Sequence, residues 1–335
     1  MQVACVISRS PPSVPFMLRI LLVKTSSLGD VVHNFPAVTD IRRQLPNARI
    51  EWVVEEAYAP LVALHPAVDE VIAIAIRRWR RAMTRRSTWH EFSDLRRRLG
   101  NRSYDRVIDT QGLVKSAWIA RLARGEHIGF SRQTAREPMA ARFYETTFHV
   151  PENRHAVERN RMLIAMALNL KIHTPIDYGL SRVRERCDTQ SAKPYAVLLH
   201  GTARQEKEWP EGDWQELGRF IEAQGLQVVL PWGSEREESR SKRLAECMTN
   251  ATVPPRHSIN DVAALLAAAR FVVGVDTGLL HLGAALGVPT VAIFKGSDPI
   301  LTGPMGAGRI AICGSRGQIP TVQEVIAAVG RIRSQ

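Results

Sequence analysis

One loop near the start of the chain combines hydroxyl, glycine and carboxylate groups that could either move a proton or cap a helix. TSSLGD (residues 25–30) follows the apolar run LRILLVK and ends in Asp30, ahead of a helical period of apolar residues. Serine and aspartate are preferred helix N-caps and Gly29 permits a turn, so capping is the structural interpretation. A carboxylate that accepts a proton is the functional one. The spacing matches neither a P-loop nor a GxGxxG fingerprint.

A second loop presents a hydroxyl and an amine after another apolar run. LHGTARQEKEWP (residues 199–210) contains Thr202 and Lys207 and closes with Trp-Pro. The lysine ammonium is a flexible point charge that suits a pyrophosphate. For this segment taken alone, a solvated charged loop is an equal alternative.

The segment VDTGLLHLGAALGVPT (residues 275–290) favours an anion site most strongly. An apolar run leads into Asp276, Thr277 and Gly278, and a helix of small residues begins at once. Backbone N–H groups of a first helical turn and the helix dipole attract anions, and a glycine lets a phosphate approach the backbone. The alternative is a well-capped helix in which His281 is an ordinary core or surface imidazole.

A tryptophan and several glutamates follow a further predicted strand in LPWGSEREE (residues 230–238). Trp232 could lie against a nucleobase, because an indole offers a large apolar face. Glu235 or Glu237 could accept hydrogen bonds from ribose hydroxyls. An indole that fills the domain core is an equal alternative.

Arginines gather in IRRWRRAMTRR (residues 76–86), and Arg96 to Arg98 and Arg136 add to them. A run of one charge is most often a solvated helix face. Because the cluster has little acidic compensation in the sequence, we expect a phosphorylated or carboxylated partner.

Strands that alternate with helices must position these loops. Apolar runs predict strands over residues 18–24, 49–56, 68–76, 105–112, 195–201, 226–233, 271–276 and 290–294. Helical periods lie between them, for example over residues 58–65, 213–223, 235–248, 259–269, 279–286 and 321–332. The alternation predicts an α/β protein of two doubly wound, Rossmann-like domains. The polar, proline-bearing residues 172–194 break the rhythm, and we expect the interdomain connection there.

Length and composition limit the class of protein. The 335 residues suffice for two globular domains, and the net charge of +12 favours a polyanionic partner. The cysteines lie far apart without metal-ligand spacing, which argues against a disulfide framework or a structural zinc. No apolar run reaches the roughly 20 residues of a transmembrane helix, and residues 1–16 lack the apolar core of a signal peptide. We expect these 16 residues to be a disordered extension and the protein to be cytoplasmic.

Taken together, nine strings resemble the type I lipopolysaccharide heptosyltransferases of glycosyltransferase family 9. They run in order from Met17 to about residue 313: KTSSLGDVVH, WVVEE, AIRRWR, DTQGLVKSA, QTAREP, HAVERNR, KEWP, LPWG and DTGLLHL. DTGLxH marks the wider family, whereas KTSSLGD with AIRRWR and TAREP is specific to type I. Residues 295–320 depart from the type I pattern.

The resemblance implies a GT-B fold in which two domains face a central cleft. Residues 17–180 would bind the acceptor and residues 181–335 the donor. The implied reaction is an inverting, single-displacement transfer of L-glycero-D-manno-heptose from ADP-heptose onto the first Kdo of Kdo2-lipid A. It needs no metal and no other cofactor. The acceptor implies work at the cytoplasmic face of the inner membrane, in peripheral contact with anionic lipid.

The same resemblance assigns roles to individual residues. Asp30 matches the catalytic base. The residues that match the donor site are Thr202, Lys207, Trp232, Glu237, Asp276, Thr277, Gly278, Leu279 and His281. Those that match the basic surface for Kdo carboxylates and lipid A phosphates are Arg77, Arg78, Arg80, Arg81, Lys115 and Arg136.

Two classes of alternative remain beside this hypothesis. A nucleotide-sugar 2-epimerase shares the GT-B architecture, but it has no need of an arginine-rich acceptor face. A non-catalytic protein that binds nucleic acid or a membrane surface would account for the charge. Nucleic-acid binding predicts aromatic residues interleaved with basic ones, and only Trp79 and Trp89 interrupt the arginine cluster, so no nucleic-acid partner is expected.

Overall fold

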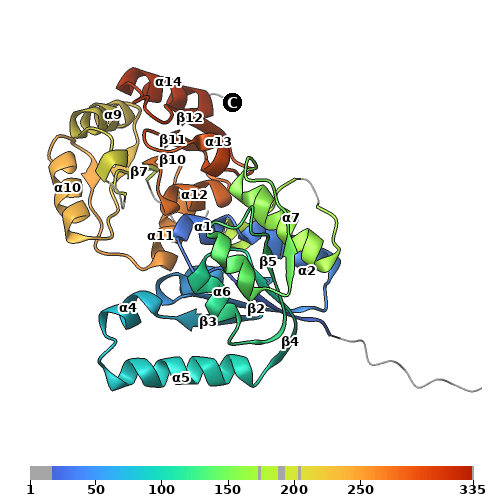
Figure 1. Cartoon of the computed structure of the whole chain (residues 1–335). Helices are drawn as coiled ribbons and strands as arrows, with labels where there is room; N and C mark the ends of the chain where they lie inside the picture. Colours follow the sequence, from blue (N-terminus) through green and yellow to red (C-terminus); the bar gives the residue numbers. More distant parts are fainter. Residues whose placement is uncertain (1–16, 173–174, 188–192, 203–204, 334–335) are drawn as a thin grey trace, which may run out of the picture.

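The computed structural model describes residues 17–172, 175–187, 193–202 and 205–333, and it contains two parallel six-stranded sheets (Figure 1). The first sheet has the order β3-β2-β1-β4-β5-β6. Its strands are β1 (Arg19–Val23), β2 (Arg49–Glu55), β3 (Glu70–Ile74), β4 (Ser103–Asp109), β5 (Arg124–Phe130) and β6 (Thr146–Phe148). In the centre of this sheet, Val23 of β1 lies opposite Val53 of β2 and Asp109 of β4.

The second sheet repeats this topology with the order β12-β11-β10-β7-β8-β9. Its strands are β7 (Tyr195–Leu199), β8 (Gln227–Val229), β9 (Ala251–Thr252), β10 (Phe271–Val275), β11 (Thr290–Ile293) and β12 (Ile310–Cys313). The prediction of two doubly wound α/β domains is confirmed. In such sheets ligands bind beyond the carboxyl ends of the strands where the chain order reverses. We call these places switch points: the first lies at the β1–β4 pair and the second at the β7–β10 pair.

Helices surround both sheets. Those of the first half are α1 (Leu28–Val32), α2 (Phe35–Gln44), α3 (Ala59–Val62), α4 (Ile76–Arg81), α5 (Arg86–Gly100), α6 (Val114–Ala120) and α7 (Ala156–Leu168). Those of the second half are α8 (Ser181–Cys187), α9 (Glu211–Ala223), α10 (Glu235–Ala245), α11 (Ile259–Ala267), α12 (Gly278–Ala285), α13 (Pro299–Thr302) and α14 (Val322–Arg333). Short 3₁₀ helices span Glu56–Tyr58, Pro138–Phe143 and Gln205–Lys207.

The helical period that follows the first loop forms two helices, α1 and α2, rather than one. The N–H of His33 closes α1 by hydrogen bonding to the carbonyl oxygen of Gly29, and Asn34 occupies the N-cap position of α2 without a side-chain capping hydrogen bond. Pro36 lies in the first turn of α2, the position at which a missing N–H costs least. Asp30 therefore sits on a short, separate helix at the end of β1.

The central strands are buried because helices cover both faces of each sheet. Ile20 to Val23 in β1 have no exposed surface, and every residue of β10 is buried. This near-continuous apolar pattern is typical of parallel sheets. It gives the loops that follow these strands a rigid base.

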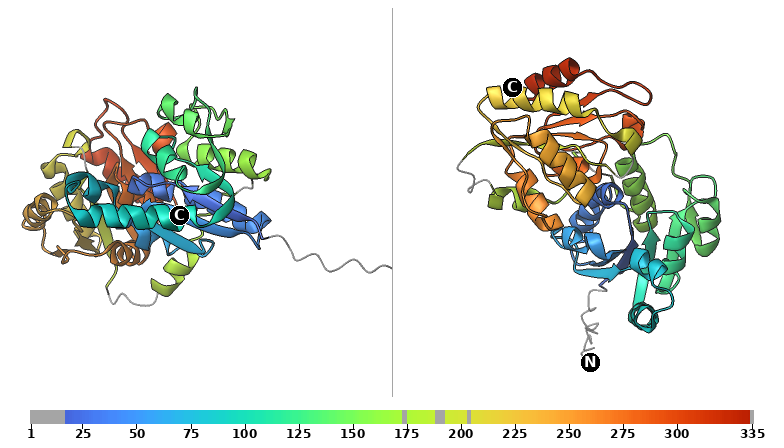
Figure 2. Two further views of the ribbon diagram at one scale, coloured as in Figure 1. Left: turned by 60° about the horizontal axis from the view of Figure 1, so that its bottom comes forward. Right: turned by 90° about the vertical axis from the view of Figure 1, so that its left-hand side faces the viewer.

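The two sheets lie in separate lobes (Figure 2), and α1 contacts α12 where the lobes meet. Helix α7 packs against α2 of the first lobe, and α8 packs against α11 of the second. These contacts suit the predicted division between residues 180 and 181, which remains a prediction. The predicted N-terminal extension, residues 1–16, lies outside the described residues. None of the described helices is long and apolar enough to cross a membrane.

Candidate active site

Asp30 is both a helix cap and a partly exposed carboxylate. It is the third residue of α1, and its Oδ2 atom accepts hydrogen bonds from the backbone N–H and the hydroxyl of Ser27 at 2.9 and 3.0 Å. A quarter of its side chain is exposed, at 25%. The capping interpretation is therefore right, and the carboxylate is still accessible to a substrate.

Positive charge keeps this carboxylate ionised. Burial alone would raise the pKa of Asp30, but the charges of Lys24 and Arg136 and the hydrogen bond from Ser27 outweigh burial and lower that pKa to about 2. An Nη atom of Arg136 lies 3.5 Å from the Asp30 carboxylate. Near neutral pH, Asp30 can accept a proton but is a weak base.

Gln111, which follows β4, holds the loop that precedes Asp30 and follows β1, so its hydrogen bonds span the first switch point. Its side-chain oxygen accepts hydrogen bonds from the Thr25 N–H at 2.7 Å and the Thr25 hydroxyl at 2.8 Å, and its amide donates to the carbonyl of Ser26. The Lys24 ammonium donates to the carbonyl of Thr110 at 2.8 Å. Both residues lie in segments that resemble the family, DTQGLVKSA and KTSSLGDVVH, but no role is predicted for either of them from the sequence.

Asp276 organises the second switch point. Its Oδ2 atom accepts hydrogen bonds from the Lys207 ammonium and the Ser297 hydroxyl, and its backbone carbonyl accepts one from the Thr202 hydroxyl at 3.3 Å. Burial would raise the pKa of Asp276, but hydrogen bonds from His281, Lys207 and Ser297 hold it well below its ordinary value. The ionised Asp276 thus holds Lys207 beside the start of α12. Ser297 is not predicted as a site residue from the sequence, because it lies in the segment that departs from the type I pattern.

The first turn of α12 is available to an anion. Thr277 precedes the helix in an extended conformation, and its hydroxyl makes no capping hydrogen bond. The first N–H groups of any helix have no partner within the helix, and here they belong to Gly278 and Leu279 at the start of α12. Positive charge from Lys207 and the helix dipole act at the same point. The structure thus brings together most of the predicted donor residues.

The two switch points meet through glycines. A Cβ atom on Gly278 would lie 2.6 Å from Cβ of Leu28, and one on Gly29 would lie 3.0 Å from the His281 ring. Real Cβ atoms do not approach other atoms as closely as 2.6 Å. The glycines therefore let α1, which carries Asp30, lie against the N-terminal turn of α12.

Three histidines line this contact between the lobes. Nε2 of His33 lies 3.3 Å from Nδ1 of His281, and the rings of His33 and His155 are 5.4 Å apart. His155 receives a hydrogen bond from the Val157 N–H at Nδ1, so its Nε2–H donates to the Gly303 carbonyl at 2.9 Å. Burial, with His281 and His155 nearby, lowers the pKa of His33 well below its ordinary value. Within the described ranges, no group of three or more His, Cys, Asp or Glu side chains could hold a metal ion.

Glu237 and Trp232 lie at the end of the neighbouring strand. The Glu237 carboxylate caps α10 by accepting hydrogen bonds from the N–H groups of Gly233 at 2.7 Å and Ser234 at 3.2 Å. It also lies against Gly201, where a Cβ would be 2.7 Å from it, so Glu237 is close to the end of β7. The half-buried Trp232 donates its indole N–H to the carbonyl of Pro254 at 2.8 Å.

The structure corrects the prediction that the arginine cluster has little acidic compensation. Arg78 forms ion pairs with Glu56 at 3.0 Å and Glu91 at 2.9 Å. Arg97 pairs with Asp94 and Arg98 with Glu70. The prediction was wrong for these arginines because two of the acidic partners, Glu56 and Glu70, come from other segments of the chain.

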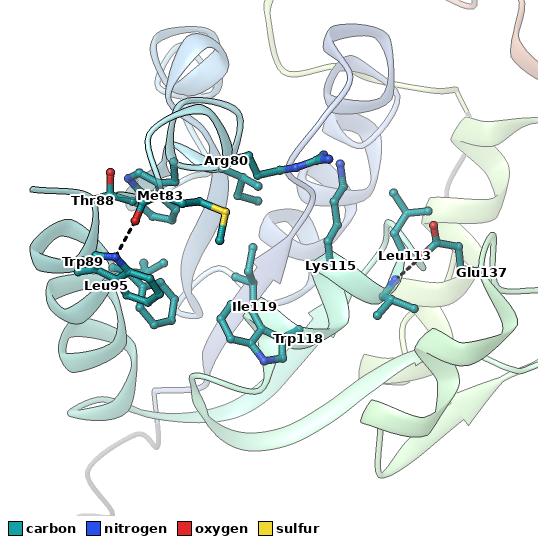
Figure 3. A pocket seen from close by; sticks show the side chains of 14 residues that line it. Arg80, Met83, Thr88, Trp89, Leu95, Leu113, Lys115, Trp118, Ile119 and Glu137 are labelled. Atoms are coloured by element: carbon teal, nitrogen blue, oxygen red, sulfur yellow. Dashed lines mark hydrogen bonds between the residues drawn. The ribbon is translucent and has the colours of Figure 1, made fainter. Parts of the chain in front are cut away.

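The other predicted acceptor residues are exposed, and Lys115 and Arg136 lie beside the loop of Asp30. Arg77 extends over the ring of Tyr58 at 5.5 Å, and Arg80 and Arg81 are exposed. The Lys115 ammonium lies 3.5 Å from the Ser26 hydroxyl. Arg80 and Lys115 line one pocket together (Figure 3). An exposed set of cations therefore extends from Asp30 toward α4.

Known proteins share both the sequence and the fold. The model of glycosyltransferase family 9 (heptosyltransferase) matches residues 92–328. Lipopolysaccharide heptosyltransferase 1 of Salmonella typhimurium is 45% identical over 298 residues, which are 88% of this chain and 94% of that protein.

Two solved structures of the E. coli heptosyltransferase WaaC are similar to this chain. The one with ADP has a TM-score of 0.88 and 42% identity and covers 94% of this chain and 100% of that chain. The one with ADP-2-deoxy-2-fluoro heptose has a TM-score of 0.85 and 41% identity, and it covers 94% of this chain and 99% of that chain.

Proposed function

Because the chain belongs to glycosyltransferase family 9, we propose that it transfers L-glycero-D-manno-heptose from ADP-heptose to the first Kdo of Kdo2-lipid A. One observation carries the proposal. The accessible Asp30 carboxylate lies on a helix that contacts the N-terminal turn of α12, beside the Lys207–Asp276 pair. A base and an anion site meet where two Rossmann-like lobes join, as a transfer between two bound substrates requires.

The second domain, residues 181–335, binds the donor. Its pyrophosphate would accept hydrogen bonds from the first turn of α12 and from Lys207 and Thr202, and its nucleoside would extend toward the end of β7. The full set is Thr202, Lys207, Trp232, Glu237, Asp276, Thr277, Gly278, Leu279 and His281. Asp276 acts by holding Lys207, because its carboxylate accepts the hydrogen bond of that ammonium.

The reaction is a single displacement with inversion. The acceptor hydroxyl attacks the anomeric carbon of the heptose, the bond from that carbon to the pyrophosphate breaks, and ADP leaves with its electrons. Asp30 takes the hydroxyl proton late in the step, when the attacking oxygen has become acidic, so a low pKa is compatible with its role. Lys207 and the α12 N–H groups stabilise the charge that grows on ADP. No step requires a metal ion.

The first domain, residues 17–180, binds the acceptor through exposed cations. Arg136 and Lys115 lie beside the loop of Asp30, where Kdo carboxylates would bind. The remaining acceptor residues are Arg77, Arg78, Arg80 and Arg81, which lie on α4. Because Arg78 already pairs with two glutamates, its contribution is smaller than that of Arg80.

The acceptor also determines where the enzyme works. Kdo2-lipid A is an anionic lipid, and we propose that the protein meets it at the cytoplasmic face of the inner membrane as a peripheral protein. The net charge of +12 supports this proposal, because basic surfaces are attracted to anionic leaflets.

The proposal is tested by following both substrates. Purified protein is incubated with ADP-heptose and deacylated Kdo2-lipid A. Mass spectrometry measures the mass of the acceptor, and chromatography measures the amounts of ADP-heptose and ADP. We expect the acceptor to gain one heptose and ADP to appear in equal amount. A donor altered without acceptor would support the epimerase instead, and binding of either substrate without turnover would support a non-catalytic protein.

A further inference from the structure

An open apolar pocket lies beside the acceptor surface and has no role in the chemistry described above. It has a volume of about 770 Å³ and lies between α4 and α5 on one side and α6 on the other. Figure 3 shows Trp89 and Leu95 on one wall and Trp118 and Ile119 on the other, with Met83 above them. A pocket of several hundred Å³ is large enough for a small ligand or for one segment of a larger one.

Three large apolar side chains that line this pocket are exposed. Met83 is 60% exposed, Trp89 57% and Trp118 47%. Clustered exposed apolar side chains mark binding sites, whereas isolated ones do not. The rings are also held in place: Trp118 stacks on Phe92 with ring centroids 5.4 Å apart, and the Trp89 indole donates to the Met83 carbonyl at 2.8 Å. The cavity is therefore formed before any ligand arrives.

Cations occupy the rim of the same pocket. The Arg80 and Lys115 side chains extend along its upper edge in Figure 3. The Lys115 ammonium is 3.5 Å from the hydroxyl of Ser26, in the loop that carries Asp30. Residues three apart on a helix lie on the same face, so Trp118 in the pocket and Lys115 at the rim belong to one surface of α6. An apolar cavity with a cationic rim fits an amphiphile whose head is anionic.

We propose that this pocket receives an acyl chain of the lipid acceptor. The inference rests on the proposed function, because it extends the same acceptor site. With the Kdo hydroxyl at Asp30 and a Kdo carboxylate at Lys115, a lipid phosphate meets Arg80. An acyl chain attached beside that phosphate turns into the space between Trp89 and Trp118. A groove with helices on two sides can hold a single chain between its walls, whereas a bilayer surface would be met by a flat or convex patch.

The test compares acylated with deacylated acceptor. We would measure kcat and KM of wild-type protein and of the Trp89→Ala and Trp118→Ala variants with Kdo2-lipid A in a fixed concentration of detergent and with its deacylated form. Losing one large aromatic contact should raise KM for the acylated acceptor about tenfold. KM for the deacylated acceptor and both kcat values should not change. Ile319→Ala, which alters a 51% exposed side chain of the second domain, is the matched control.

Several outcomes would overturn the proposal. Equal losses with both acceptors would mean that the tryptophans only support α6 and Lys115, and no change with either would mean that the pocket is not used. If the variants sediment less with anionic phospholipid vesicles while KM for detergent-dispersed acceptor is unchanged, the pocket binds the bilayer instead. If wild-type protein transfers heptose to neither acceptor, the proposed function fails. In that case the pocket can still be tested by binding, because quenching of tryptophan fluorescence by the acylated acceptor but not by the deacylated one would support it.

Discussion

The arginines of α4 form one group in the sequence, but they differ in whether an acidic side chain pairs with them. Arg78 is held by Glu56 and Glu91, whereas Arg80 extends along the rim of the pocket next to Lys115. An arginine that is already paired offers less net charge to an incoming phosphate. The basic acceptor surface is therefore smaller than a count of arginines suggests.

Two substitutions measure this difference. We expect Arg80→Met to raise KM for the acceptor about tenfold, the effect of losing one charge-assisted hydrogen bond. Arg78→Met should raise KM for the acceptor at most about fivefold, because an exposed ion pair between Arg78 and the acceptor would contribute little to binding. Steady-state kinetics with the deacylated acceptor give both values. A larger effect at Arg78 than at Arg80 would show that the glutamates release Arg78 when the substrate binds.

The sequence predicts individual site residues only where a local string carries them. Asp30, Lys207 and Asp276 each follow a strand-like run, so position and residue type together indicate chemistry. Gln111 holds a loop 85 residues away, and His155 approaches His33 from another segment. Such partners depend on the fold and leave no spacing pattern. The acidic partners of Arg78 and Arg98 were missed for the same reason.

At the scale of elements, the contact between α1 and α12 is the feature on which the site depends. It joins the helix that carries Asp30 to the helix that would bind the donor pyrophosphate, and glycines at both surfaces allow the approach. A side chain at either glycine would separate the base from the donor site without disturbing either sheet.

Gly278→Ala tests this contact. The new Cβ would lie 2.6 Å from Cβ of Leu28, which cannot swing away, so one helix must shift. Overpacking typically costs 1–3 kcal/mol, and we expect kcat/KM to fall about tenfold or more. Gly212→Ala in α9 is the control, because a Cβ there meets nothing within 4 Å. Unchanged kcat/KM in Gly278→Ala would show that the observed contact is not the reacting arrangement.

Most elements of both sheets can be predicted from the sequence, and the exceptions have physical reasons. The buried strands β7 and β10 are uninterrupted runs of apolar residues and glycine, β1 is apolar after Arg19, and β2 contains the apolar run Trp52, Val53 and Val54. The sequence does not predict β5, which contains Glu126 and His127 between two glycines, or the short strands β6, β9 and β12, which have three, two and four residues. These strands exist because a neighbouring strand offers hydrogen bonds, which is information from tertiary structure.

At the scale of the whole molecule, buried neutral histidines link stability to pH. Burial lowers the pKa of His65 and of His200 to about 4, and it also lowers the pKa of His33 and of His155. In the unfolded chain a histidine has a pKa of about 6.5. Between these two values the unfolded state binds more protons than the native state, so acidification through this range favours unfolding.

The free energy of unfolding should therefore fall between pH 7 and pH 5, by about 2 kcal/mol for His65 and again for His200, and the thermal midpoint should fall with it. His65→Gln should reduce this pH dependence, because glutamine cannot titrate but can replace the hydrogen bonds with Thr39 and the Ala67 N–H. His90→Gln, at an exposed position, is the control. The same slope in wild type and His65→Gln would mean that His65 is protonated in the native protein. Calorimetry at pH 7, 6 and 5 gives the answer.

The central claim is that Asp30 accepts the acceptor proton where α1 meets α12, and Asp30→Asn tests it most directly. Asparagine has the same shape and keeps an oxygen for the Ser27 hydrogen bonds, so α1 should stay capped. We would measure acceptor-dependent ADP release and, by calorimetry, ADP affinity for wild type and variant. We expect kcat to fall on the order of 100-fold or more while ADP binds as before. Wild-type turnover in the variant would contradict the role of Asp30, whatever the reaction.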